Sequence, residues 1–363
     1  MKIIHVVESF AGGVYDFLVD LTLGMPKDEH VIIYTTREHT PKDFEKMFSP
    51  QTQFIKWPNA TREINPKADI LALVQLIKIL KDFPDADAIH LHSSKAGFLG
   101  RIAARWLGMG QKVLYTPHGV SFLRQDVSPF KHKIFVYLEK LGAFFGGKVI
   151  GCSQSEAEAF HPYGIDAQYV NNGIKCEQLD SKSHTASEET IKVGTIGRIT
   201  YPKNPELFNH IAERFVDDHR IEFLWIGDGE LGHLLTASNI RKTGWLNRND
   251  VETELNGIDI YLSTSLWEGL PLSVLQAMCA SKPLLLSDCV GNRDLVQDEI
   301  NGKIFNNLDE GIRALTELLE QHEKRVLMGQ RSRELLAQEF SIEQMINGYM
   351  NLYQSLKQSN RKA

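Results

Sequence analysis

Several features that would place this 363-residue chain in a special class of protein are scarce or missing. Only four cysteines occur, and no two of them form a Cys-x-x-Cys pair, so neither a structural zinc site nor a disulfide-rich secreted fold is expected. No apolar run approaches the roughly 20 residues that span a bilayer. No short-period repeat or low-complexity tract is present. We therefore expect a globular, cytoplasmic protein whose cysteines are reduced.

Charge is unevenly distributed along the chain. Residues 1–150 carry 19 Lys and Arg against 15 Asp and Glu, whereas the remainder carries 21 against 31. Within residues 95–150 the count is 9 basic against 2 acidic. Such a basic region among aromatic residues is typical of a surface that binds an anionic membrane or ligand, and the alternative is a buried helix with solvated cations. The aromatic residues concerned are Phe122, Phe130, Phe135, Tyr137, Phe144 and Phe145.

Short apolar strands alternate with helical patterns in two successive sets, which predicts two parallel, doubly wound α/β sheets. The first set of expected strands is Lys2–Val7, His30–Thr36, Gln53–Trp57, Ala88–His92, Lys112–Thr116 and Lys148–Cys152. The second is Ile191–Ile196, Glu222–Ile226, Ile240–Thr243, Ile258–Thr264 and Pro283–Ser287. Because Glu8 interrupts the first apolar run, that run is interpreted as a strand and not as a signal peptide.

A polar, Ser- and Thr-rich stretch separates the two sets and predicts an interdomain linker. We expect an N-terminal Rossmann-like domain at 1–175, the linker at 176–190 and a C-terminal Rossmann-like domain at 191–340. The last segment, 341–363, contains an amphipathic helix from Ile342 to about Leu356.

The segment from Ser265 to Met278 carries the most information about a site. An expected buried strand ends in a turn with Glu268, Gly269 and Pro271, and an apolar-periodic helix begins near that proline. The carboxyl ends of parallel strands are where open α/β sheets bind ligands, and a helix N-terminus favours phosphate. A carboxylate beside a phosphate cradle indicates a sugar nucleotide, with the amides holding the diphosphate and Glu268 holding sugar hydroxyls.

Three further turns of the second set could contribute to the same site. Arg198 and Lys203 flank the turn after the strand Ile191–Ile196, where two cations can neutralise a diphosphate as it departs. The Gly227-Asp228-Gly229 turn permits close backbone approach, with a simple hairpin-like turn as the alternative. Gly244 and Trp245 could hold a nucleobase through backbone groups, and we expect the Trp245 ring to serve packing more than base stacking.

In the first set, Gly12 and Gly13 follow the first strand, where glycines allow a ligand to approach the backbone or simply make a turn. Their spacing is not Gly-x-Gly-x-x-Gly, which disfavours a nicotinamide dinucleotide. His118, in Thr116-Pro117-His118-Gly119, stands at the end of another strand and could donate a hydrogen bond to a sugar or a reacting oxygen, or be structural. His90 and His92 share one face of a strand without an evident third metal ligand, so we expect hydrogen bonding there.

Taken together and in order, these motifs resemble the retaining glycosyltransferases of family four (glycosyl transferases group 1), which have the GT-B fold. The motifs are Gly12-Gly13, Thr116-Pro117-His118-Gly119, Cys152-Ser153-Gln154-Ser155-Glu156, Asn171-Asn172-Gly173-Ile174, Gly197-Arg198 with Lys203, Gly227-Asp228-Gly229 and Trp267-Glu268-Gly269-Leu270-Pro271. The resemblance covers nearly the whole chain and implies two facing Rossmann-like domains, with a last helix that crosses back to the first.

The resemblance also implies roles for single residues. Arg198 and Lys203 would bind the donor diphosphate, His118 would contact the donor sugar, and Glu268 would hold sugar hydroxyls. The donor-binding set would be Gly12, Gly13, Gly197, Gly227, Gly244, Trp245, Gly269, Leu270, Leu272, Ser273 and Gln276. The family pattern has a second glutamate where this chain has Gln276, which can still accept a hydrogen bond from a ribose hydroxyl without charge assistance.

The function implied is transfer of a sugar, with retention, from a nucleotide diphosphate sugar to a glycan hydroxyl in cell-surface polysaccharide biosynthesis. A UDP-sugar is the expected donor and a lipid-linked saccharide the expected acceptor, at the cytoplasmic side of the membrane. Neither a metal nor another cofactor is expected, since cations and helix amides stabilise the leaving group, and no nucleic acid partner is expected. Two alternatives stay open: a sugar-nucleotide 2-epimerase of the same fold, and a non-catalytic sugar-binding protein.

Overall fold

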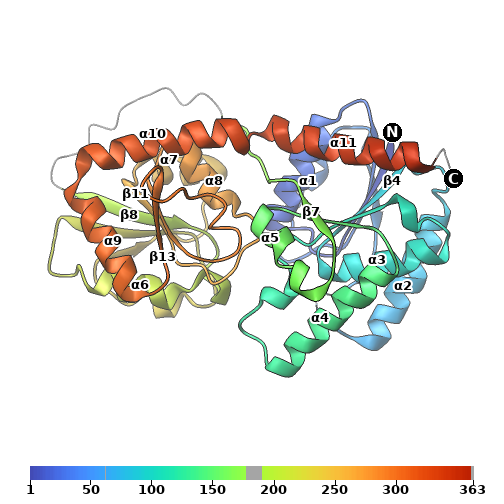
Figure 1. Ribbon diagram of the computed structural model, residues 1–363, viewed down its shortest axis with the longest axis horizontal. Coiled ribbons are helices and arrows are strands. Elements are labelled where there is room, and N and C mark those ends of the chain that lie inside the picture. Colours follow the sequence, from blue (N-terminus) through green and yellow to red (C-terminus); the bar gives the residue numbers. More distant parts are fainter. Residues whose placement is uncertain (62, 177–189, 361–363) are drawn as a thin grey trace. The chain divides into compact units, whose positions relative to one another are not determined.

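The computed structural model describes residues 1–61, 63–176 and 190–360, which form two compact units (Figure 1). Unit 1 contains Met1–Asn172 together with Ile342–Ala363, and unit 2 contains Gly173–Ser341. Most of the expected linker, residues 177–189, lies outside the described residues. Each unit is a parallel sheet with helices on its faces, so the predicted pair of doubly wound α/β domains is confirmed.

Unit 1 contains a seven-stranded sheet in the order β3-β2-β1-β4-β5-β6-β7. Its strands are β1 (Lys2–Val7), β2 (Glu29–Tyr34), β3 (Gln53–Lys56), β4 (Ala88–His92), β5 (Val113–Thr116), β6 (Lys148–Gly151) and β7 (Ala167–Tyr169). All its pairings are parallel. Strand β7 is absent from the sequence-based expectation because it is only three residues long and largely exposed at the sheet edge, without an apolar run.

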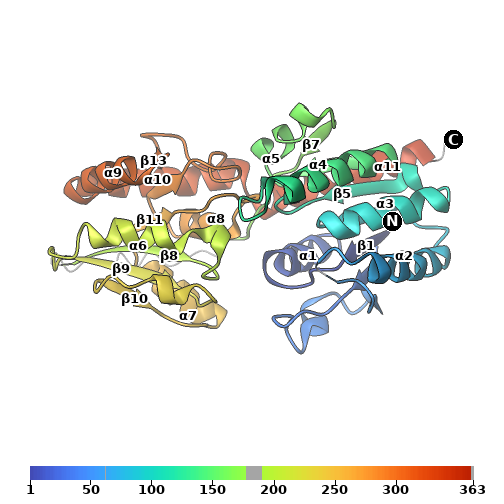
Figure 2. The ribbon, with the colours of Figure 1, turned by 90° about the horizontal axis from the view of Figure 1, so that it is seen from below.

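Helices cover both faces of this sheet (Figures 1 and 2). They are α1 (Gly12–Gly24), α2 (Pro66–Lys81), α3 (Ser94–Trp106), α4 (Pro129–Phe144), α5 (Gln154–Glu158) and α11 (Ile342–Asn360). On one face α1 and α11 bury Ile3 and Val7 of β1, and on the other α2 and α3 bury Ile4 and Val6. The alternation of inward side chains along β1 therefore supplies both cores, as expected for a strand covered on both sides.

Helix α11 belongs to unit 1, although it comes last in the chain. Tyr349 and Tyr353 on this helix are fully buried, and the Tyr353 hydroxyl lies 2.7 Å from Nδ1 of His90 on β4. Lys357, one turn further on, pairs with Asp87 at 3.0 Å. The amphipathic pattern that predicts this helix thus places its apolar side on the sheet of unit 1.

Unit 2 contains a six-stranded parallel sheet in the order β10-β9-β8-β11-β12-β13. Its strands are β8 (Ile191–Ile196), β9 (Ile221–Ile226), β10 (Ile240–Lys242), β11 (Ile260–Ser263), β12 (Leu284–Ser287) and β13 (Gly302–Phe305). Its helices are α6 (Pro205–Glu213), α7 (Arg248–Asn256), α8 (Leu272–Cys279), α9 (Leu308–Glu320) and α10 (His322–Glu339). Strand β13 is absent from the sequence-based expectation because it is a short edge strand that begins with a glycine.

Chain order reverses between β1 and β4 in unit 1, and between β8 and β11 in unit 2. At such a switch point the loops leave neighbouring strands in opposite directions and open a crevice at the carboxyl edge of the sheet. The loops after β8 and β11 contain Arg198, Lys203 and Glu268. The fold therefore brings the predicted phosphate-binding and sugar-binding residues of unit 2 to one edge.

The prediction that all four cysteines are reduced is wrong for one pair. Cys176 and Cys279 form a disulfide within unit 2, with a Cα–Cα distance of 5.7 Å. These two residues are 103 positions apart, so no local spacing in the sequence indicated that the fold would bring them together. Cys152 and Cys289 are free and buried, as expected.

The two helices of the basic region differ in burial: α3 buries seven of its residues, whereas α4 lies largely at the surface. Among the residues of α4, only Glu139 and Gly142 are buried, and Glu139 pairs with Arg101 of α3 at 3.0 Å. Phe130, Tyr137 and Phe144 are each more than 60% exposed, and so is Trp106 at the end of α3. Of the other aromatic residues expected in a surface patch, Phe122 lies in the core. In the described part of the chain, no helix combines the length and the apolarity needed to cross a bilayer.

Candidate active site

The loop after β8 begins with a glycine in a backbone conformation that a side chain would strain. Gly197 has φ 149°, and its carbonyl accepts a 2.8 Å hydrogen bond from the Trp225 indole. A Cβ atom at Gly197 would lie 3.2 Å from Cε of Lys203. Because Gly197 has no side chain, the Lys203 side chain can pack against the backbone at the end of β8.

The loop after β11 is hydrogen-bonded to the loop after β8. The Thr264 hydroxyl is within 3.0 Å of the carbonyls of Lys203 and Asn204, and the Leu266 amide donates to the Pro202 carbonyl at 2.8 Å. These contacts hold the short 3-10 helix Tyr201–Lys203 against the switch point. The two loops that carry the expected site residues thus form one hydrogen-bonded layer.

Lys203 and Glu268 form an ion pair at the centre of this layer. Lys203 Nζ donates to Glu268 Oε1 at 2.7 Å, and the Ser265 hydroxyl donates to the same oxygen at 2.8 Å. Burial lowers the pKa of Lys203, but the Glu268 carboxylate outweighs it and the net shift of the pKa is upward. About a fifth of each side chain remains exposed. The lysine is therefore a cation that can reach both the carboxylate and a ligand at the edge of the sheet.

Arg198 has a more open setting than Lys203. Its guanidinium lies 3.3 Å from the Glu230 carboxylate in the loop after β9, and both side chains are largely exposed. An exposed pair of this kind contributes little to stability. Arg198 can consequently leave Glu230 for a phosphate at small cost, whereas Lys203 is fixed in place by its partner.

Helix α8 presents its N-terminus next to this ion pair. Pro271 is the N-cap, no side chain caps the helix, and the first turn contains no acidic residue. Val274 is the first residue of α8 whose amide bonds to the Pro271 carbonyl, so the amides of Leu272 and Ser273 precede the intrahelical ladder. Gln276 is exposed one turn later. Such a helix start suits an anion.

The loop after β12, for which the sequence predicted no role, packs against the Glu268 turn. The Glu268 amide donates to the Val290 carbonyl at 3.0 Å, and a Cβ atom on Gly291 would lie 2.7 Å from the Gly269 carbonyl oxygen. Buried Asn292 bonds to the Ser287 carbonyl at 3.0 Å. Because β12 neighbours β11, the end of that strand could have been expected at the same edge, and its Gly-Asn pair was the available signal.

The remaining donor-binding candidates of unit 2 lie in the loops after β9 and β10. A Cβ atom on Gly227 would lie 2.3 Å from the Gly197 carbonyl oxygen, so this glycine lets the loops after β8 and β9 meet. Gly244 has φ 74° with open space at its Cβ position. Trp245 is 59% exposed, so it lies at the surface of the loop after β10. Whether it packs or stacks on a base stays a prediction.

Unit 1 contains the other candidates. Gly12 has φ 57° and open space around its Cβ position, and Gly13 follows it in the first turn of α1. His118 has φ 52°, an uncommon conformation for a non-glycine residue, at the end of β5. Three amides bond to the buried Glu156 carboxylate and fix this loop: Gly119 (2.7 Å), Val120 (3.1 Å) and Cys152 (2.7 Å). The fold thus assembles Arg198, Lys203 and Glu268 in unit 2, and holds Gly12, Gly13 and His118 in unit 1.

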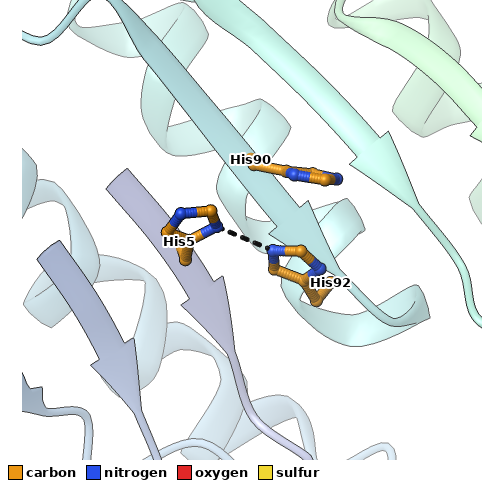
Figure 3. A group of neighbouring side chains, drawn as sticks. All are labelled: His5, His90 and His92. Carbon is orange, nitrogen blue, oxygen red and sulfur yellow. Dashed lines mark hydrogen bonds between the residues drawn. The ribbon is translucent and has the colours of Figure 1, made fainter. Parts of the chain in front are cut away.

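A possible metal-binding group also lies in unit 1. Across residues 1–61, 63–176 and 190–360, the one cluster with metal-ligand spacing is His5, His90 and His92, whose ligand atoms lie within 4.8 Å of one another (Figure 3). His5 is the third imidazole that the sequence analysis did not find. Both ring nitrogens of His90 already have partners, the hydroxyls of Tyr353 and Thr116. The expected hydrogen bonding at these strands is therefore what the structure shows.

Comparison with known proteins agrees with this architecture. A family model described as "Glycosyltransferase Family 4" matches residues 11–178, and one described as "Glycosyl transferases group 1" matches residues 190–321. The chain is 29% identical over 323 residues to the UDP-Gal:alpha-D-GlcNAc-diphosphoundecaprenol alpha-1,3-galactosyltransferase of Escherichia coli, covering 82% of both chains. It is 24% identical to an uncharacterized 41.2 kDa protein in the cps region of Klebsiella pneumoniae, covering 98% of this chain and 100% of the other.

Solved structures of the same fold include Anabaena HepE in complex with UDP and glucose, with a TM-score of 0.78 at 16% identity, covering 98% of this chain and 100% of that one. Sucrose-phosphate synthase from Thermosynechococcus elongatus matches with a TM-score of 0.79 at 16% identity, covering 99% and 100%. At these identities the likeness shows the fold. The family assignment comes from the two family matches and the Escherichia coli relative, which show that this chain belongs to glycosyltransferase family 4, glycosyl transferases group 1.

Proposed function

We propose that this enzyme transfers a sugar, with retention, from a UDP-sugar to a hydroxyl of a lipid-linked glycan in the synthesis of a cell-surface polysaccharide. The observation that carries the proposal is the layer of unit 2 in which Lys203, Glu268 and the start of α8 meet at the switch point. The name of the Escherichia coli relative includes a UDP-sugar and a diphosphoundecaprenol acceptor, which makes UDP-galactose the first donor to test.

In this proposal the chain's own residues stabilise the departing diphosphate. Lys203 and the exposed Arg198 supply positive charge, and the amides of Leu272 and Ser273 donate hydrogen bonds to phosphate oxygens. Glu268 keeps one carboxylate oxygen for Lys203 and Ser265 and turns the other to sugar hydroxyls. The released phosphate oxygen takes the proton of the acceptor hydroxyl on the same face of the sugar, so no protein nucleophile takes part.

The proposed donor site needs no divalent metal, because cationic side chains and helix amides provide the charge compensation. We expect the same turnover in EDTA as in added magnesium or manganese. Strict dependence on a metal would contradict this part of the proposal.

The test is an assay of nucleotide release from a panel of UDP-sugars, with and without an undecaprenyl-diphosphate-linked N-acetylhexosamine acceptor. We expect release that depends on the acceptor, and a product whose anomeric configuration, read by NMR, matches that of the donor. Conversion of donor without acceptor would indicate the epimerase, and binding without turnover of any donor would indicate a sugar-binding protein.

A second proposal concerns the surface of α4 and the end of α3, where we propose that the protein contacts an anionic membrane carrying its acceptor. Phe130, Tyr137 and Phe144 are exposed on α4 beside Lys131 and Lys133. Exposed aromatic rings among cations are the pattern of an interfacial helix. Liposome flotation tests this: the double variant Phe130→Ser/Phe144→Ser should lose binding to anionic vesicles.

The matched control for flotation changes two apolar side chains that are exposed on α10, Val326 and Leu327, to serine. That variant should float like the unchanged protein. If the unchanged protein does not bind anionic vesicles, or binds neutral ones equally well, the membrane proposal is wrong.

A further inference from the structure

A line of buried imidazoles crosses the sheet of unit 1 and ends at His118. His30 of β2, His5 of β1 and His92 of β4 project from the face that α1 and α11 cover, and all three are at most 3% exposed. Figure 3 shows His5 and His92 turned toward each other from neighbouring strands. The register pairs His5 with His90, yet its hydrogen bonds run diagonally to His30 and His92.

The ring-to-ring contacts form a continuous series of hydrogen bonds. His30 Nδ1 lies 3.2 Å from His5 Nε2, His5 Nδ1 lies 3.2 Å from His92 Nε2, and His92 Nδ1 lies 3.0 Å from His118 Nε2. Beyond the last ring, His118 Nδ1 lies 3.3 Å from the sulfur of Cys152. We call His30, His5, His92 and His118 the histidine relay.

The far end of the histidine relay sets its direction. His30 Nε2 lies 3.3 Å from the Met25 carbonyl, which can only accept a hydrogen bond. His30 therefore carries its proton on Nε2, and in the neutral ring Nδ1 must accept from His5. His5 must therefore donate from Nε2 and accept on Nδ1, and the same reasoning applies in turn to His92 and His118. Every member of the relay is thus protonated on Nε2 and accepts on Nδ1.

The surroundings keep the rings neutral, as this argument requires. Burial lowers the pKa of each relay histidine, well below its ordinary value for His5 and His92 and to about 3 for His118. Burial also raises the pKa of the Cys152 thiol, so that the thiol keeps a proton to donate to His118 Nδ1. No ring has a second proton to offer.

We infer that the histidine relay fixes His118 as a hydrogen-bond acceptor toward the donor sugar, with His92, His5 and His30 as positioning residues. The inference deepens the proposed function and rests on it for the identity of the ligand. The Nε2 proton of His118 is committed to His92, so the ring meets a ligand only through Nδ1. A sugar hydroxyl would replace the Cys152 thiol, which is a weak donor. In this role His118 accepts a hydrogen bond, whereas the sequence led us to expect either a donor or a structural residue.

The direct test is the protonation state of each imidazole, read from nitrogen-15 shifts of histidine-labelled protein at pH 7. Four rings should show a protonated Nε2 and a bare Nδ1, assigned through His→Gln variants. A relay ring with a protonated Nδ1, or with both nitrogens protonated, would overturn the inference. So would stoichiometric zinc on His5, His90 and His92, measured by mass spectrometry of the purified protein.

A kinetic test uses two variants of matched burial. His5→Phe interrupts the relay two bonds away from His118 and leaves the His92 Nε2 proton without its acceptor, which frees His92 to change tautomer. We expect the KM for the donor to rise about tenfold, the value of one lost hydrogen bond. His90→Phe removes an equally buried imidazole of the neighbouring strand that lies outside the relay, and its donor KM should stay within about twofold of the unchanged enzyme.

Rescue separates positioning from a loss of packing. His5→Gln restores both a donor and an acceptor and should recover most of the donor KM. Equal KM values for His5→Phe and His90→Phe would contradict the inference. If the unchanged protein turns over no sugar nucleotide, the proposed function fails, and the nitrogen-15 measurement alone then decides whether the relay exists.

Discussion

The central polar side chains of the two sheets in this glycosyltransferase differ in both location and charge. In unit 1 the polar centre lies inside the core and consists of uncharged imidazoles, each with hydrogen bonds at both nitrogens. In unit 2 it lies at the carboxyl edge, partly open to water, and consists of the Lys203–Glu268 ion pair. The centre of unit 1 consists of neutral groups, whereas the centre of unit 2 consists of charged ones.

The difference follows from the cost of burial. An ionised group without solvent or a partner is expensive in a sheet interior, whereas a neutral ring with both nitrogens bonded is tolerated. At the edge of unit 2, one-fifth exposure and a carboxylate partner keep Lys203 charged. The pKa shifts therefore run in opposite directions: downward for the buried histidines and upward for the lysine. A change of pH should therefore alter the stability of the two units differently.

The largest expected effect is acid destabilisation confined to unit 1. The unfolded histidines take up protons below about pH 6.5, while the folded ones, with lowered pKa values, do not, so stability is present above that pH and is lost as the pH falls. The rings concerned are His5, His30, His90, His92 and His118. Each of these histidines can lower the free energy of unfolding by up to about 1.4 kcal/mol per pH unit. Buried Glu8 and Glu156, whose pKa is raised, offset part of this at lower pH.

Peptide-resolved hydrogen exchange at pH 7 and pH 5.5, corrected for intrinsic rates, measures this. Segments of β1 and β4 should lose protection at the lower pH, and segments of β8 and β11 should keep it. Because the pKa of Lys203 is raised, its contribution to the stability of unit 2 should be lost only as the pH rises above about 10.5. Equal protection of both sheets from hydrogen exchange at pH 5.5 would contradict this prediction, because the neutral histidines would then cause no loss of stability in acid.

The second effect is on catalysis and concerns the charged centre. Lys203→Ala should lower kcat by about a hundredfold to a thousandfold, because a fixed donor to the leaving diphosphate is lost. The matched control is Lys242→Ala, which removes an exposed lysine of β10 in the same unit. Thermal unfolding should show both variants folded. Near-normal turnover of the Lys203→Ala variant would remove this lysine from the proposed site.

The sequence predicts the charged centre better than the neutral one, and the reason is local spacing. Arg198 and Lys203 share one turn, and Glu268 stands in another turn that directly follows a strand, so strand-end reasoning alone brings them together. The histidine relay joins residues of different strands through diagonal contacts. Its members become neighbours only when the strand order is known, and for that reason His5 and His30 received no role from the sequence.

The same limit explains the other misses. Gly291 contacts the Glu268 turn because β12 lies next to β11 in the sheet. The Cys176–Cys279 disulfide joins two residues that are 103 positions apart. Periodicity predicts strands and helices well, and short edge strands such as β7 and β13 escape it because they have little apolar length.

The third effect tests whether the charge of unit 2, and not only its hydrogen bonds, matters. Glu268→Gln keeps an oxygen that can accept from Lys203 and Ser265 but removes the negative charge. We expect kcat/KM for the donor to fall about tenfold, the difference between a charge-assisted and a neutral hydrogen bond. Glu252→Gln, an exposed acid paired with Arg248 on α7, serves as control. An unchanged kcat/KM would mean that the carboxylate does not hold the sugar.

The smallest effect concerns the neutral side chain that this chain carries at the charged edge. Gln276 is exposed on α8 one turn beyond Leu272 and Ser273, where the family pattern has an acid. Gln276→Glu should tighten binding of UDP by about fivefold, because a carboxylate accepts more strongly from ribose hydroxyls than an amide does. Gln276→Ala, which cannot accept, should weaken it by a similar factor. Titration calorimetry with UDP measures both. If the glutamate variant binds UDP more weakly than the unchanged protein, repulsion between the new carboxylate and the diphosphate exceeds the gain at the ribose. The edge of unit 2 then favours a neutral acceptor at this position because of charge repulsion, whereas unit 1 favours neutral rings because of burial.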